Sequence, residues 1–96
     1  MSDEEIIPVE MFCSFYHVDQ TFLENLESHG LISISYRENH RYILKEEMAE
    51  LEKFSRMYYD LDINIAGIDA LKHLLEKIKL LQEETEKLRA RLRIYE

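Results

Sequence analysis

The sequence predicts a mainly α fold, built from a winged helix-turn-helix with a small two-stranded wing and a long C-terminal coiled-coil helix. Three observations favour this fold class. Residues 64–93 contain no proline and carry apolar side chains at alternating spacings of three and four. Two short apolar patterns of helical period come early, and two short runs of strand-forming residues follow them. We expect the winged unit over residues 1–63, and over residues 64–96 a helix that packs on it and dimerises.

The helix-turn-helix is expected from two short helices joined by a tight turn. The first begins at Pro8, because the N–H that proline lacks would be unpaired in a first helical turn anyway, and it runs to about Tyr16. The second is capped by Asp19 or Thr21, of which Asp19 is the stronger N-cap type. It ends at Gly30, which suits the left-handed residue that follows a helix.

The wing and the next helix follow directly. Residues 31–35 and 41–44 are short and rich in residues that suit strands, and the polar turn between them predicts a hairpin. Residues 45–59 then carry an apolar stripe at helical spacing. A break follows, after which Asn64 or Asp62 is expected to cap the terminal helix.

The terminal helix carries a heptad repeat, the pattern of a coiled coil. A helix of this length spans roughly 45 Å, which is longer than the core of so small a domain, so we expect a second copy as its partner. Glu84 and Arg89 occupy the flanking positions that can bridge across a parallel seam. The alternative is that the stripe packs on its own N-terminal half, as we expect for residues 68–75. The residues expected in the seam are Leu74, Ile78, Leu81, Thr85, Leu88, Leu92 and Tyr95.

Composition narrows the possible partners. The chain has 96 residues, 46% of them hydrophobic, and a formal net charge of −8, which repels nucleic acid and anionic membranes and attracts basic partners.

A single cysteine permits no internal disulfide and fits a reducing cytoplasm. No apolar run approaches the length of a membrane span, and the acidic start is unlike a signal peptide. Residues 1–6 are expected to fray.

No catalytic, cofactor or metal site is expected. Cys13 shares helical spacing with apolar neighbours, and no histidine is placed to activate it, so a buried thiol is the better interpretation. The four histidines are scattered, without metal-ligand spacing. The two glycines stand apart, so there is no phosphate-binding loop. The sequence therefore predicts a protein that is not an enzyme.

Several stretches resemble the MerR-like winged-helix family. Residues 23–31, LENLESHGL, are similar to that family's signature LRxYExxGL, and Arg41-Tyr42 followed by residues 46–48 resemble its wing and third helix. The departures are informative, because the arginine of the signature is replaced by Glu24 and its aromatic residue by Leu26. The resemblance implies the fold and, in most members, DNA binding.

The charge of the expected recognition helix argues against DNA. Residues 20–29 contain no lysine or arginine, and within residues 1–44 the basic side chains are Arg37 and Arg41. A recognition helix needs cations for phosphates and donors for base edges. We interpret the helix-turn-helix as reused for another kind of partner.

One branch of the family is more similar. Residues 61–71, LDINIAGIDAL, leading into residues 80–84, LLQEE, resemble the CbpM chaperone modulators, which are short, acidic and end in a heptad helix. The resemblance implies that the chain binds the J-domain of a DnaJ/CbpA-like cochaperone and inhibits its cooperation with Hsp70, without a cofactor. The candidate contacts are acidic residues on faces expected to be exposed: Glu10, Asp19, Glu24 and Glu27.

Two other functions stay open at this point. The first is a MerR-like DNA-binding transcriptional regulator that uses the wing arginines and the basic end of the last helix. The second is a structural oligomerisation module, which predicts tight self-association and no other partner. The charge of residues 20–29 separates the first of these from a protein-binding adaptor.

Overall fold

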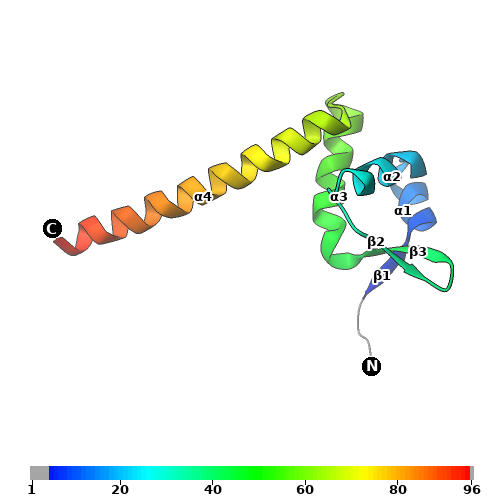
Figure 1. Ribbon diagram of the computed structural model, residues 1–96, viewed down its shortest axis with the longest axis horizontal. Coiled ribbons are helices and arrows are strands. Elements are labelled where there is room, and N and C mark those ends of the chain that lie inside the picture. The colour runs from blue at the N-terminus through cyan, green and yellow to red at the C-terminus, as the bar shows by residue number, and fades with distance from the viewer. Residues whose placement is uncertain (1–4, 96) are drawn as a thin grey trace.

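The computed structural model describes residues 5–95 and confirms the mainly α fold class. Figure 1 shows a small mixed unit at one end of the molecule and a single helix extending away from it. The molecule is correspondingly elongated, at 60 × 40 × 21 Å. In chain order the elements are β1 (Ile6–Pro8), α1 (Val9–Tyr16), α2 (Gln20–Ser28), β2 (Ile34–Arg37), β3 (His40–Leu44), the 3-10 turn η1 (Lys45–Glu47), α3 (Met48–Ser55), the π-helical turn η2 (Arg56–Asp60) and α4 (Ile65–Tyr95).

The sheet has three antiparallel strands in the order β1-β3-β2, one more than the predicted wing. Ile6 pairs with Leu44 on one side of β3, and Ile34 pairs with Ile43 on the other. The expectation of a frayed segment is therefore wrong at Ile6, while residues 1–4 lie outside the described residues. A strand of three residues is too short to give a period-2 pattern. It forms because the free edge of β3 offers backbone hydrogen-bond partners.

The hairpin turn sets the register of the wing. Glu38 and Asn39 have φ of 50° and 68°, as in a type I′ turn, and Arg37 pairs directly with His40. This tight turn shifts the first wing strand to residues 34–37, three residues later than predicted at its start. The predicted strand residues Leu31 and Ile32 lie before it, and both are buried.

The core lies where α1, α2, α3 and the sheet meet. Burying one Leu, Ile or Phe side chain contributes about 1.5–3 kcal/mol, so this cluster supplies most of the driving force for folding. Within the described residues of α4, the one buried residue is Ile68, the fourth residue of the helix. Only the beginning of α4 is therefore anchored in the core. The fully buried side chains are Val9, Phe12, Leu23, Leu26, Ile43, Leu51, Phe54 and Ile68.

The predicted helix ends are confirmed at two positions. Gly30 has φ of +74°, and Leu31 N–H donates to the carbonyl of Leu26 at 2.9 Å, as in a Schellman motif. Asn64 caps α4, since its Oδ1 accepts the Gly67 N–H at 2.8 Å. These two ends fix where the recognition helix stops and where the long helix starts.

Candidate functional site

Arg41 joins the wing to both helices of the helix-turn-helix. Its Nη1 donates to Glu24 Oε2 at 2.9 Å, and its Nη2 donates to Gln20 Oε1. The same Nη2 lies 3.9 Å from Glu10 Oε2. Only 24% of the Arg41 side chain is exposed. A wing arginine that could meet DNA phosphates is thus held by the protein's own acidic and amide groups.

The four predicted partner-binding residues do not form one cluster. Glu10 and Glu24 come together around Arg41, which offsets part of their charge. Glu27 is joined to the wing, because the Tyr36 hydroxyl donates to its Oε1 at 3.3 Å. Desolvation raises the pKa of Tyr36, and the negative charge of Glu27 raises it further. We call the surface that carries Glu10, Glu24, Glu27 and the wing residues Tyr36 and Arg41 the α2–wing surface. It is less negative than the sequence suggested.

Asp19 stands apart from the other three. It occupies the N-cap position of α2, as predicted, but its side chain makes no capping hydrogen bond. Its backbone N–H instead donates to the Tyr59 hydroxyl at 3.0 Å, a contact that ties the turn of the helix-turn-helix to η2. This contact joins residues 40 positions apart in the sequence, so no local pattern predicts it.

The exposed face of α2 carries acidic and neutral polar side chains. Phe22, Leu23 and Leu26 point into the core, which leaves Glu24 and Asn25 toward solvent. Without lysine or arginine, this face offers phosphates no cation.

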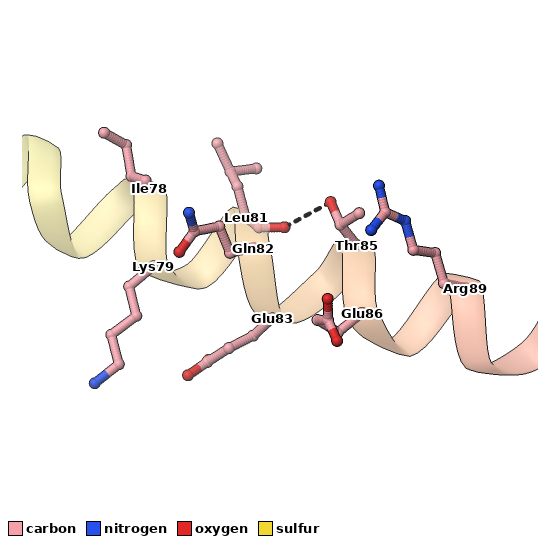
Figure 2. A pocket seen from close by; sticks show the side chains of 8 residues that line it. All are labelled: Ile78, Lys79, Leu81, Gln82, Glu83, Thr85, Glu86 and Arg89. Atoms are coloured by element: carbon pink, nitrogen blue, oxygen red, sulfur yellow. Dashed lines mark hydrogen bonds between the residues drawn. The ribbon is translucent and has the colours of Figure 1, made fainter.

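The seam predicted on α4 is uncovered in the single chain. Ile78 is 49% exposed and Leu92 62%, and Leu74, Leu81 and Leu88 fall between these values. Figure 2 shows Ile78, Leu81 and Thr85 on one side of the helix, with Lys79 and Glu83 on the opposite side. The Thr85 hydroxyl donates to the Leu81 carbonyl at 2.9 Å, so this polar seam residue has its hydrogen-bond acceptor within its own helix.

Packing of α4 on its own domain stops earlier than predicted. Leu75 was expected to pack there, yet it is 43% exposed. It lines an open groove of about 360 Å³ with Phe54 and Met57, between α3 and α4. Figure 1 shows that α4 leaves the domain at an angle to α3, so its later turns extend away from α3.

Other kinds of site find little support in residues 5–95. No group of three or more histidine, cysteine or carboxylate side chains there could hold a metal ion. None of the helices there has the length and hydropathy needed to cross a membrane. Cys13 is buried, as predicted, and burial raises the pKa of its thiol.

A winged helix-turn-helix with an appended long helix is the class of protein that this geometry defines. The family model described as "MerR HTH family regulatory protein" matches residues 7–90, which cover both helices, the wing and most of α4. The chain therefore belongs to the MerR helix-turn-helix family. Searches of curated proteins and of solved structures gave no match.

Proposed function

We propose that this protein is an acidic, dimeric winged-helix adaptor that binds the J-domain of a DnaJ-like cochaperone and inhibits its cooperation with Hsp70. One observation carries the proposal: the recognition helix has no basic residue, and Arg41 of the wing is paired with Glu24 at 2.9 Å. The helix-turn-helix is thereby poorly suited to DNA. The similarity of residues 61–71 to the CbpM modulators supplies the particular partner.

The physical basis of the interaction is charge complementarity. A J-domain presents a basic helix to Hsp70, and a protein with a formal net charge of −8 attracts it. Complementary charge mainly speeds association and selects the partner, whereas a few apolar contacts hold the complex. Covering the basic helix would exclude Hsp70 from it, which is how binding becomes inhibition. We place this interaction in the cytoplasm, as the single cysteine suggests.

Dimerisation through α4 is part of the proposal. Its apolar stripe is half-exposed over roughly five turns, and a stripe of that length without a partner is unfavourable in water. A second copy covers it with the same repeat, and Glu84 and Arg89 favour a parallel seam. A structural module with no further partner would share this dimer but would bind no J-domain.

Family membership favours a second candidate, a DNA-binding transcriptional regulator. In that function Arg41 must leave Glu24 and Gln20 to reach a phosphate, and Arg37 must contribute the other wing contact. Each phosphate contact would make affinity fall steeply with salt.

A calorimetric titration separates these functions. We would titrate the full chain with a purified J-domain from the same organism and, separately, with duplex DNA of mixed sequence. Binding to the J-domain but not to DNA is the expected result. Binding to DNA alone would refute the adaptor, and no binding to either would leave the oligomerisation module.

A further inference from the structure

The turn η2 presents two tyrosines to solvent, and Leu61, which directly follows it, is also exposed. Its π-helical geometry ends with Leu61 N–H donating to the Arg56 carbonyl at 3.2 Å. Tyr58 is 36% exposed, Tyr59 40% and Leu61 64%. In the preceding turns of α3, Leu51 and Phe54 are buried, so the exposed aromatic side chains begin in η2.

The two tyrosine rings are held in place by a buried ring of α2. Buried Phe22 of α2 lies 4.6 Å from Tyr58 and 5.3 Å from Tyr59, measured between ring centroids. The tyrosines meet each other edge to face at 4.9 Å. The Tyr59 hydroxyl is fixed by the Asp19 N–H. Such preorganised aromatic side chains lose little entropy when a partner covers them.

Open hollows lie on both sides of Tyr59, each with a carboxylate in its wall. One, of about 320 Å³, is lined by Asp62 together with both tyrosines. The other, of about 310 Å³, is lined by Asp60 and also by Arg56. Asp19 adds a third carboxylate at the N-cap of α2.

These three aspartates differ from the glutamates around the wing. Within the described part of the chain, no ion pair involves Asp19, Asp60 or Asp62, whereas Glu10 and Glu24 share Arg41. Their charge is therefore available to a partner's cations. We call the surface formed by Asp19, Tyr58, Tyr59, Asp60, Leu61 and Asp62 the tyrosine–aspartate face.

We infer that the tyrosine–aspartate face is where a basic amphipathic helix of a partner protein docks. Lysine or arginine side chains lie over the exposed rings and enter the hollows, where they meet Asp60 and Asp62. Leu61 supplies the apolar contact that holds the complex. Only the identification of this helix with that of a J-domain rests on the proposed function.

The test compares two variants with the same net charge. Asp19→Asn/Asp60→Asn/Asp62→Asn removes three charges from the face, and Glu10→Gln/Glu24→Gln/Glu27→Gln removes three from the α2–wing surface. Asparagine is itself a good N-cap at position 19, and it tolerates the positive φ of 57° at position 62. Because the net charge matches, long-range attraction cancels from the comparison.

Binding is measured by calorimetry with two probes, a synthetic arginine-rich amphipathic helical peptide and the purified J-domain. We expect the aspartate variant to bind the peptide about tenfold more weakly than the wild type, and clearly more weakly than the glutamine variant. Leu61→Ser should also weaken binding, although it changes no charge and an exposed side chain is not needed for folding.

Three outcomes would overturn the inference, and a fourth would refute only the proposed function. If the glutamine variant loses as much affinity for the peptide as the aspartate variant, or more, the docking surface lies at the wing. If the wild type does not bind the peptide at all, there is no docking site for a basic helix. If sedimentation shows that the aspartate variant loses its dimer instead, the occupant is the basic end of a second copy's α4. Peptide binding without J-domain binding would refute the proposed function and leave the tyrosine–aspartate face in place.

Discussion

At the scale of single residues, Arg41 decides which acidic side chains remain available to a partner. The sequence places it in the wing, where an arginine ordinarily meets DNA phosphates. In the folded chain its side chain extends from β3 to α1 and α2, where its positive charge offsets part of the negative charge of Glu10 and Glu24. One guanidinium thus weakens a DNA interface and an acidic docking surface together. Within residues 5–95, Asp19, Asp60 and Asp62 make no such ion pair and keep their charge.

Replacing Arg41 tests its structural role. Arg41→Met keeps much of the side-chain volume and removes the charge, and we expect the free energy of unfolding to fall by about 1 kcal/mol, as for a partly exposed ion pair. Urea denaturation measures this change. Lys53→Met, which removes the pair with Glu50 at 3.1 Å, should cost less, because both partners are 43% exposed. J-domain binding should persist, whereas a regulator that uses this wing would lose affinity for DNA.

Tyr16 gives a pH-dependent prediction. Its hydroxyl donates to Glu52 of α3, and this hydrogen bond is the main reason that the pKa of Tyr16 is raised above 10.0. The folded state therefore favours the protonated phenol. The resulting stability is fully present below pH 10 and is lost as the pH rises through the raised pKa.

We accordingly expect Tyr16→Phe to lower the urea midpoint at pH 8 and to differ less from the wild type at strongly alkaline pH. Tyr42→Phe serves as the control, because within residues 5–95 the Tyr42 hydroxyl makes no hydrogen bond, so its loss should have the same small effect at both pH values. A Tyr16→Phe effect that grew with pH would contradict the assignment.

At the scale of elements, α4 has two parts with different roles. Its first turns are fixed by the Asn64 cap and by buried Ile68. The remainder extends into solvent with an uncovered heptad stripe. A helix in a protein gains most of its stability from packing an apolar face, so we propose that the outer part is stabilised by a second copy.

Leu81→Lys tests the seam. A lysine at this position would place a charge in the middle of the apolar stripe, and we expect the dimer to weaken strongly. Sedimentation equilibrium measures the mass. Glu83→Lys introduces the same side chain on the opposite side of α4 (Figure 2) and should leave the mass unchanged. Equal masses for Leu81→Lys and the wild type would refute the coiled coil.

At the scale of the whole molecule, charge is separated along the long axis. The winged unit carries most of the acidic excess, whereas the last turns of α4 contain Lys87, Arg89, Arg91 and Arg93. An approaching basic partner is therefore drawn toward the winged end.

Charge reversal tests this steering. Glu24→Lys/Glu27→Lys changes the net charge by +4, from −8 to −4, and we expect slower association with a J-domain and a weaker dependence on salt. Stopped-flow measurements at two ionic strengths give both quantities. Thr21→Ser/Ser28→Thr alters the same helix without a change in charge and should leave the rate unaffected. Unchanged kinetics in the charge-reversed variant would show that long-range attraction does not guide this complex.

The sequence by itself determined the elements whose signals are local. The heptad stripe, the cap at Asn64 and the left-handed Gly30 each depend on spacing or on one residue type, and the structure has the helix ends where they predict. The acidic character of α2 is likewise a property of composition.

Only the tertiary structure decided what these elements present to a partner. Strand β1 exists because β3 offers a free edge, and the wing register follows from a turn with positive φ at Glu38 and Asn39. The predicted acidic set divides because Arg41 reaches across 17 residues to Glu24, while Tyr59 meets Asp19 across 40. Contacts between residues so far apart in the chain depend on packing, which no local pattern encodes.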